Sequence, residues 1–592
     1  MYVLGISCFF HDSAAALLRD GVLVAAAEEE RFTRKKHDYD FPINAIRYVL
    51  SVEGIASEDL DYVAFFEKPF VKFERILMTS LQLFPRALPV FREAMASWLL
   101  DKLWVSALIV EKVGVPRERI LFSEHHLSHA ASAFFCSPFD DAAILTIDGV
   151  GEWATATMGT AKGTEVRLTH EVRFPHSIGL LYSTFTAFLG FEVNEGEYKV
   201  MGMAPYGQPR YMDEVSKLVR MSPDGSFRLN MEYFAFHRST RVPYTRKFLH
   251  LFGEPRPPES KFFTDLSGYP SYFGSKPDDY VTQARRNQHY ADIAASIQAV
   301  TEQLILNMAS AVWRQTRSAR LCLAGGVGLN SVANSKILRE TGFSELYVQP
   351  AAGDSGGALG AALYVYHTLL GKPRNFVMEH AFWGQAYTEA EIRTFLDEEG
   401  IWYEHLEEDR LLDRTVDALV DGQVVGWFQG GFEWGPRALG HRSILADPRR
   451  ADMKDIVNTK IKFREPYRPF APSVLNEHVH DYFDAPGVER QYPARFMLLV
   501  EDVKPSKYDA IPAVTHIDGS ARLQTVTRDG NARYWSLIDR FGRATGVPVV
   551  LNTSFNLRGE PIVNTPREAY STFARSGMDT LVLGNCVVRK KE

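Results

Sequence analysis

Short apolar runs that end in polar or glycine-containing turns recur along the N-terminal half of the chain. Residues 2–7 (YVLGIS) predict a strand, and two more strand-like runs, SAAALL and VLVAAAEEE, flank the hairpin signal Asp20-Gly21. Residues 141–159 (DAAILTIDGVGEWATATMG) show the same order of strand, glycine turn and strand. This unit therefore occurs twice, once turning near Asp12 and once near Asp148.

Helical periodicity fills most of the chain between and after these units. Residues 40–55 and the aromatic, leucine-rich stretch 67–113 predict helices, and 289–316 has an apolar stripe typical of a core helix. Residues 120–135 predict a strand that passes into a helix. Residues 205–290 are rich in proline, glycine and aromatic residues and show little periodicity. This insertion is either a surface excursion or a lid or wall of an acceptor site, because long irregular segments are often functional.

A third element, residues 320–337 (RLCLAGGVGLNSVANSKI), predicts a strand, a glycine-rich turn and a helix. Backbone amides at such a helix start suit an adenosine or phosphate group. Two strand–turn–strand units followed by this element are expected of the actin-like ATPase fold, in which duplicated ribonuclease-H-like halves clamp a nucleotide. The predicted fold class of this half is therefore α/β with a duplicated core.

The pattern restarts near residues 371–380. Residues 388–400 (TEAEIRTFLDEEG) predict a capped helix, 413–422 predict another, and 423–430 (QVVGWFQG) predict a buried strand. A chain of 592 residues is too long for one compact core. We therefore expect a second α/β domain after this point.

Composition and charge narrow the class of protein. The net charge of −7 and the isoelectric point of about 6.2 argue against an avid nucleic-acid binder. The four cysteines form no CxxC pair, which favours buried free thiols and a reducing compartment. The N-terminus lacks a basic segment ahead of its apolar run, and charges interrupt the most apolar helical stretch, near 94–113. We expect a cytoplasmic protein without a signal peptide or membrane span.

The stretch HHLSH at 125–129 offers candidate metal ligands. His125 and His129 are four residues apart, so a helix would place both imidazoles on one face, one turn apart. The alternative is a pair of structural histidines on a half-buried helix. Asp148 and Asp354 each end an apolar run beside glycines, in ILTIDGVGE and AAGDSGGALG. Together the four residues predict a site for a divalent metal with two histidine and two carboxylate ligands.

The C-terminal part holds cations within glycine-, proline- and aromatic-rich turns rather than in charged helices. Arginine offers bidentate hydrogen bonds to phosphate and lysine adds a point charge, while asparagine and serine orient a carbonyl or amide. The pattern favours a pocket for a phosphorylated anion over an ordinary solvated surface. The residues concerned are Arg437, Arg442, Lys460, Lys462, Arg464, Arg468, Arg522, Asn552, Thr553, Ser554 and Arg558.

Taken together, these motifs resemble the NodU/CmcH/TobZ family of O-carbamoyltransferases over essentially the whole chain. The matching stretches are VLGISCFFHDSAAALL, EEERFTRKKH, EHHLSHAASAFF, TIDGVGE, EGEYKVMGMAPYG, AGGVGLN, AAGDSGGALG, GPRALGHRSILADP, YRPFAPSVL and LNTSFNLRGEPIV. Ten motifs in the same order are highly specific.

The resemblance implies two domains and a reaction shared between them. Residues 1–372 would form a metal- and ATP-binding carbamoyl-transfer domain, similar to the protein of tRNA threonylcarbamoyl-adenosine synthesis. Residues 373–592 would form a YrdC-like domain that makes carbamoyladenylate from carbamoyl phosphate and ATP. The carbamoyl group would then pass to a hydroxyl of a small-molecule natural product. Iron(II) is the implied metal, with another divalent ion as the alternative, and Mg²⁺ accompanying ATP.

Site residues follow from the matched motifs. The implied metal ligands are His125, His129, Asp148 and Asp354. The carbamoyl phosphate and nucleotide pocket would use Arg437, Lys462, Arg468, Arg522, Asn552 and Ser554, and the N-terminal ATP site would use Gly149, Gly151, Gly325, Gly326 and Asn330. His11 matches a histidine near the transfer site, and we expect it or Asp12 to act as general base. TobZ-like members have an aspartate two residues before this histidine, where this chain has Phe9, so the choice between the two stays open.

Two other functions fit part of the sequence. A tRNA-modifying enzyme would use the same two modules but should show a basic face. An actin-fold chaperone would explain the strand–turn units but not HHLSH or the C-terminal cations. We expect a small-molecule acceptor, no nucleic acid and no membrane as partners, and the 85–113 helices are the candidate interface of a homodimer.

Overall fold

The computed structural model describes residues 1–100, 102–462, 465 and 467–590. The predicted pocket residue Arg464 lies outside them. The chain divides into two compact units, and each is formed from more than one segment. Unit 1 holds residues 1–29, 37–264 and 279–377, and unit 2 holds 30–36, 265–278 and 378–592. No helix within the described part of the chain has both the length and the apolarity that a membrane span requires.

Unit 1 contains the same sheet topology twice in its described residues. In each five-stranded sheet, three antiparallel strands are followed by two parallel ones, and the first strand in the chain lies at the centre. The first sheet has the order β3 (Val22–Glu28), β2 (Ala14–Arg19), β1 (Tyr2–Ser7), β4 (Tyr62–Phe65) and β5 (Ile120–Phe122). The second has the order β8 (Glu165–Arg173), β7 (Ala154–Lys162), β6 (Asp141–Ile147), β11 (Arg320–Ala324) and β12 (Glu345–Tyr347). This duplication confirms the predicted actin-like, ribonuclease-H-like fold.

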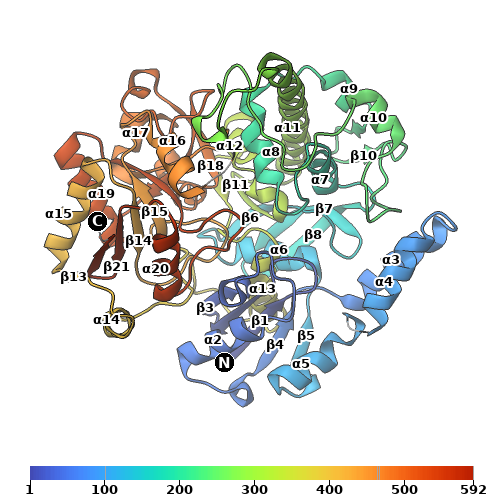
Figure 1. The fold of residues 1–592 in the computed structure, drawn as a ribbon. Helices are drawn as coiled ribbons and strands as arrows, with labels where there is room; N and C mark the ends of the chain where they lie inside the picture. The colour runs from blue at the N-terminus through green and yellow to red at the C-terminus, as the bar shows by residue number, and fades with distance from the viewer. Residues whose placement is uncertain (101, 463–464, 466, 591–592) are drawn as a thin grey trace. The chain divides into compact units, whose positions relative to one another are not determined.

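Two helices pack against each other in the core of unit 1 (Figure 1). Helix α13 (Asp354–Leu363) packs on β1, on β2 and on α6 (His125–Phe134). Glycines permit the close approach: a Cβ atom at Gly5 would lie 1.9 Å from the carbonyl oxygen of Ala358, and one at Gly360 would lie 1.8 Å from that of Ser128. The small residues of AAGDSGGALG are therefore required by packing.

The remaining helices of unit 1 surround these sheets. The predicted helical stretch 67–113 is divided into α3, α4 and α5, and α3 and α4 run side by side (Figure 1). The helices are α2 (Ile43–Glu53), α3 (Pro69–Gln82), α4 (Leu88–Leu100), α5 (Val105–Val113), α7 (Ile178–Phe188), α8 (Glu197–Met203), α9 (Met212–Ser216), α10 (Arg246–Phe252), α11 (Tyr280–Thr316) and α12 (Ser331–Glu340).

The insertion is more regular than its sequence indicates. It contains α9, α10 and a small antiparallel pair, β9 (Val219–Met221) with β10 (Phe227–Leu229). Helix α11 spans 37 residues, so the predicted start at residue 289 is wrong. Its first turns are mostly polar, and this weakens the apolar stripe on which the prediction depended.

Unit 2 is built on one mixed ten-stranded sheet in the part of the chain that the structure describes. Its order is β13 (Glu404–His405), β22 (Cys586–Arg589), β21 (Thr580–Leu583), β14 (Val425–Phe428), β15 (Arg442–Ala446), β20 (Val549–Ser554), β16 (Ala471–Leu475), β19 (Ser520–Val526), β18 (Leu499–Val503) and β17 (Phe483–Asp484). The helices of this unit are α1 (Glu30–Thr33), α14 (Glu389–Glu398), α15 (Glu408–Val420), α16 (Met453–Val457), α17 (Val479–Tyr482), α18 (Tyr492–Arg495), α19 (Ala532–Thr545) and α20 (Pro566–Arg575). Trp427, Leu537, Phe541 and Val550 are among its buried core residues. The mixed α/β class is as predicted, whereas the likeness to YrdC stays a prediction.

Segment 30–36 belongs to unit 2 although its sequence lies between two segments of unit 1. The buried guanidinium of Arg31 donates to the carbonyl of Gly435 at 2.9 Å and lies 4.2 Å from the ring centre of Phe432. Arg34 donates to the carbonyls of Pro561 and Ile562 at 2.8 and 2.6 Å. Two arginines therefore anchor this segment within unit 2.

Candidate functional site

Four buried side chains converge in unit 1. His125 and His129 lie on the first turns of α6, Asp148 follows β6, and Asp354 begins α13. The Nε2 atom of His125 is 3.0 Å from both the Oδ2 atom of Asp148 and the Nε2 atom of His129. The Oδ1 atom of Asp354 lies 3.6 Å from both histidine Nε2 atoms. One ligand atom from each residue falls within 4.8 Å of all the others.

This donor set fits a divalent metal. Both carboxylate oxygens of Asp354 are buried and have no hydrogen-bond partner among the described residues. Buried carboxylates in this state are costly unless a cation compensates them. Burial alone would lower the pKa of His129, but the negative charges of the nearby Asp148 and Asp354 carboxylates outweigh it and raise that pKa to about 9. Two imidazole nitrogens and two carboxylates are ligands that iron, zinc or manganese accepts.

Glycines allow the surrounding turns to approach these ligands. A Cβ atom at Gly151 would lie 3.0 Å from the ring of His125, and one at Gly326 would lie 3.0 Å from the Oδ1 atom of Asp148. The backbone N–H of Gly326 donates to that same oxygen at 2.8 Å. Gly151 and Gly326, which were predicted to bind a nucleotide, are therefore also needed because a side chain at either position would crowd His125 or Asp148.

The predicted nucleotide turn lies beside the cluster. Gly149 and Gly151 follow β6, and Gly325 and Gly326 follow β11, so all four glycines lie at the carboxyl ends of two parallel neighbours. Gly325 has a φ of 95°, and a Cβ atom there would lie 2.2 Å from the carbonyl oxygen of Ile147. Asn330 caps α12 by accepting from the N–H of Ala333 at 3.2 Å. A helix start beside the ends of parallel strands is suited to phosphate.

His11 and Asp12 lie in the turn after β1. The Oδ2 atom of Asp12 is 3.1 Å from Nδ1 of His11, and its Oδ1 atom is 2.6 Å from Nδ1 of His37. Burial disfavours the charged imidazole of His11, but the charges of Asp354, Asp12 and Asp148 raise its pKa to about 10. His37 ends the motif EEERFTRKKH, and its contact with Asp12 was not predicted.

In unit 2, the predicted lysine is held by oxygen atoms at the end of β20. Lys462 is buried, and its Nζ atom donates to the carbonyls of Ser554 and Asn556 at 2.5 and 3.0 Å and to the Oδ1 atom of Asn556 at 2.8 Å. The ammonium therefore fixes the turn that follows β20. Asn556 was not among the predicted residues, although it lies inside the quoted motif LNTSFNLRGEPIV.

Asn552 is buried beneath the loop between β14 and β15. Its amide donates to the carbonyl of Ala438 at 3.2 Å and to the Oε1 atom of Gln524 at 2.9 Å, and Gln524 donates to the carbonyl of Leu439 at 2.9 Å. These bonds hold the backbone directly after Arg437. In this structure Asn552 acts on the loop that carries the arginine.

The other predicted cations lie on different elements of unit 2. Arg437 is in the loop between β14 and β15, Arg522 is on β19, and Arg468 precedes β16 with its NH1 atom 3.6 Å from the Oε2 atom of Glu465. Arg442 is buried, stacks on Phe428 with 3.7 Å to the ring centre and donates to backbone carbonyls. Its contacts hold the loop rather than present a cation for a ligand.

Sequence reasoning missed the carboxylate that organises this loop. The Oε1 atom of fully buried Glu433 accepts from the backbone N–H groups of Leu439, His441 and Arg442 at 2.8, 2.9 and 3.0 Å. The only signal is a glutamate inside the apolar, glycine-rich run GGFEWGPRALG.

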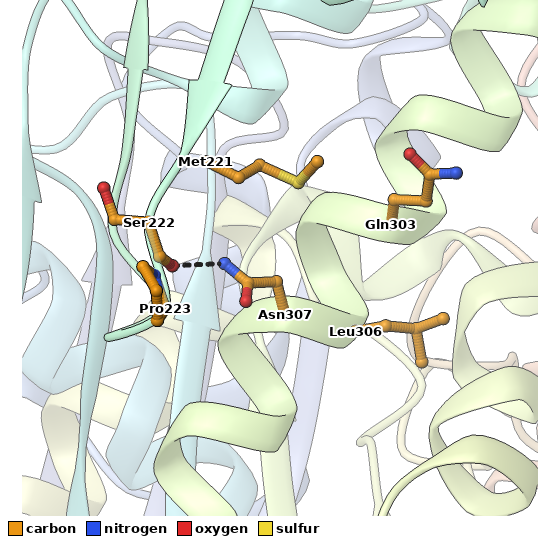
Figure 2. A pocket seen from close by; sticks show the side chains of 6 residues that line it. All are labelled: Met221, Ser222, Pro223, Gln303, Leu306 and Asn307. Atoms are coloured by element: carbon orange, nitrogen blue, oxygen red, sulfur yellow. Dashed lines mark hydrogen bonds between the residues drawn. The ribbon is translucent and has the colours of Figure 1, made fainter.

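A separate surface hollow of about 420 Å³ lies between β9 and α11 (Figure 2). The amide of Asn307 donates to the carbonyl of Ser222 at 2.9 Å across it. The lining residues are Met221, Ser222, Pro223, Gln303, Leu306 and Asn307. These side chains do not ionise, so the hollow lacks the acid, base or metal ligands found at the buried cluster.

Known families match both parts of the chain. Residues 2–363 match the family described as carbamoyltransferase N-terminus, and residues 416–590 match the family described as carbamoyltransferase C-terminus. The chain belongs to the carbamoyltransferase family. This membership confirms the resemblance that the ten motifs indicated, and the protein is a carbamoyltransferase enzyme.

Three relatives of this carbamoyltransferase show the range of the family. An uncharacterized protein of Synechocystis is 46% identical and covers 100% of this chain and 97% of its own. Nodulation protein NolNO of Sinorhizobium fredii is 37% identical over 98% of this chain and 79% of its own. The 3'-hydroxymethylcephem-O-carbamoyltransferase of Amycolatopsis lactamdurans is 30% identical over 79% of this chain and 81% of its own.

Proposed function

We propose that this carbamoyltransferase uses ATP and carbamoyl phosphate to form carbamoyladenylate and then carbamoylates a hydroxyl of a small-molecule natural product. The observation that supports this proposal most strongly is the buried group of His125, His129, Asp148 and Asp354, which lies next to glycine turns suited to a nucleotide. A second set of residues, in unit 2, supplies cations for phosphorylated substrates.

Adenylate formation is assigned to unit 2. Water would first cleave carbamoyl phosphate into carbamate and inorganic phosphate. A carbamate oxygen would then attack the α-phosphorus of ATP to form carbamoyladenylate, and pyrophosphate would leave with the electron pair of the broken P–O bond. Arg437, Arg468 and Arg522 offer guanidinium groups for the phosphates, since arginine binds them bidentately. Lys462 would support this function by fixing the turn that follows β20, and Asn552 by fixing the loop between β14 and β15.

Transfer is assigned to unit 1. The four clustered side chains would hold iron(II) or another divalent ion, which would neutralise charge on the departing AMP. The glycine turns after β6 and β11 would receive the adenylate phosphate through backbone N–H groups. His11 would accept the proton of the acceptor hydroxyl, with Asp12 orienting its imidazole at 3.1 Å. Since nearby carboxylates favour the protonated imidazole, base function requires a cation in the cluster to offset them.

The two sites predict separable defects. Full-length protein is incubated with ATP, carbamoyl phosphate and anaerobic iron(II) without acceptor, and mass spectrometry follows carbamoyladenylate and pyrophosphate. Wild type and His129→Ala are expected to form both, whereas Arg468→Ala is expected to form neither. Absence of carbamoyladenylate from metal-replete wild type would refute the adenylation step, and a shared loss in both variants would refute the division of labour. Hydroxylated metabolites are then screened for the mass of a carbamoyl group, with tRNA as the competing acceptor.

A further inference from the structure

One buried cation of unit 1, the guanidinium of Arg75, lacks an anionic or hydrogen-bonding partner in the described part of the chain. Arg75 on α3 is 7% exposed, and among the described residues its guanidinium has no hydrogen-bond acceptor and no carboxylate within ion-pair distance. Its plane lies over the ring of Phe174, 5.0 Å from the ring centre. A buried charge without a hydrogen-bonded partner is costly, so its retention calls for a ligand.

The nearest acidic groups are already used. Burial lowers the pKa of Arg75 to about 10, although the charges of Glu67 and Glu152 act in the opposite direction. Glu67 pairs with the Nζ atom of Lys72 at 2.5 Å, and Glu152 accepts from the backbone N–H groups of Lys68 and His125 at 2.8 and 3.0 Å. Neither carboxylate reaches the guanidinium of Arg75.

Arg75 is connected to the histidine–aspartate cluster through Glu67, whose charge acts on its guanidinium. The same Glu67 carboxylate lies 3.9 Å from Nδ1 of His125, on the side of the imidazole opposite the cluster. Lys72, one turn before Arg75, lies over the ring of Phe10 at 5.1 Å, and Phe10 precedes His11. The Nε atom of Arg75 is enclosed, so its remaining contact with solvent is at other atoms of the side chain.

We propose that Arg75 binds an oxyanion, a carboxylate or phosphate, carried by the carbamoyl acceptor, with Phe174 as the apolar surface beneath it. This assignment rests on the proposed transfer reaction in unit 1 and names the substrate class of that site. The planar guanidinium donates two parallel hydrogen bonds to such a group. The unpaired charge of Arg75 makes this site unsuited to a cationic group of the acceptor, because like charges repel in a buried environment.

Binding is tested on full-length protein without ATP or carbamoyl phosphate. The probes are glucuronate, glucose 6-phosphate and glucose, which share the hydroxyls of an acceptor and differ in the oxyanion. Calorimetry is expected to give wild type at least about a tenfold preference for one charged sugar over glucose, as one bidentate ion pair supplies. Arg75→Met abolishes this preference and Arg75→Lys keeps part of it, while the exposed control Arg86→Met leaves it unchanged.

Each outcome decides between supporting and rejecting the assignment. A carboxylate preference and a phosphate preference both support it and identify the oxyanion. Equal affinity of wild type for all three sugars, equal preference in Arg75→Met, or displacement of the charged sugar by AMP would overturn it. The last result would mean that Arg75 binds the nucleotide instead.

Thermal unfolding separates ligand binding from a structural role. Removal of an unpaired buried charge is expected to raise the melting temperature of Arg75→Met, whereas a structural arginine would lower it. Release of pyrophosphate from ATP and carbamoyl phosphate without acceptor is expected to be the same in Arg75→Met and wild type. Failure of that release in wild type would refute adenylation alone, while the sugar preference tests Arg75 independently.

Discussion

The three backbone bonds to Glu433 give a prediction with a definite size. Glu433→Ala leaves the N–H groups of Leu439, His441 and Arg442 without their acceptor in a largely buried loop. Each unsatisfied buried donor costs about 1–3 kcal/mol, so the free energy of unfolding is expected to fall by at least about 3 kcal/mol. A domain the size of unit 2 loses about 2–4 °C of melting temperature per kcal/mol, so the shift is at least about 6 °C.

The assay combines unfolding with catalysis. Urea unfolding of the full chain, followed by a probe in unit 2, gives the stability change, and pyrophosphate release gives adenylate formation. Glu433→Gln keeps an acceptor oxygen and is expected to lie between wild type and Glu433→Ala in both measurements. The matched control is Glu560→Gln, which removes an ion pair with exposed Arg575 at 3.0 Å and should cost about 1 kcal/mol or less.

Two results would contradict this reasoning. Stability of Glu433→Ala within about 1 kcal/mol of wild type would mean that the loop re-forms its hydrogen bonds elsewhere. Unchanged pyrophosphate release in an otherwise destabilised Glu433→Ala would mean that the position of Arg437 does not matter for adenylation.

Three further predictions concern single contacts. Gly151→Ala places a methyl group 3.0 Å from the His125 ring, so metal affinity is expected to weaken at least about tenfold, as measured by competition with a chelator. The control Gly163→Ala, which has no neighbouring atom within 4 Å, is expected to leave the metal affinity unchanged. Burial lowers the pKa of His441 to about 3, so between pH 6.5 and pH 3 the unfolded state binds a proton that the folded state does not. The free energy of unfolding therefore falls by about 2 kcal/mol from pH 7 to pH 5. Denaturation across this range should show a shallower loss in His441→Phe, and an equal slope would refute the assignment. Lys462→Met removes the ammonium that donates to Ser554 and Asn556. The rate of pyrophosphate release is expected to fall at least about tenfold, while the Km for an acceptor stays unchanged. A normal rate of pyrophosphate release would contradict this prediction.

The sequence was most informative where function depends on the ends of regular elements. The i, i+4 spacing of His125 and His129 needed only a helix, and Asp148 needed only a strand that ends at glycine. Asp354 is more than two hundred residues away, so its arrival beside them follows from the packing of α13 on α6 through Gly360. The glycine-flanked pattern of AAGDSGGALG suggested Asp354 as a fourth ligand, but the contact that brings it to the histidines depends on the folded core.

Residues that act through buried backbone groups escaped sequence reasoning. Glu433 and Asn556 lie in turns without periodicity, and their roles follow from which N–H and C=O groups the fold leaves unpaired. Arg75 was hidden in a helix predicted only from its apolar positions, since no local pattern marks a cation that the tertiary structure leaves without a partner. The polar first turns of α11 were missed for the opposite reason: they are helical without a continuous apolar stripe.

Because Arg31 and Arg34 anchor residues 30–36 in unit 2, a recombinant fragment of unit 2 needs more than the C-terminal part of the sequence. A recombinant fragment that begins at Met378 would contain the large sheet of unit 2 but would leave Phe432 and the carbonyl of Gly435 without the guanidinium that covers them. Linking residues 30–36 to the fragment, or supplying them as a synthetic peptide, restores that cover. A single break in the gene therefore cannot separate the two units, because each is built from segments that alternate along the chain.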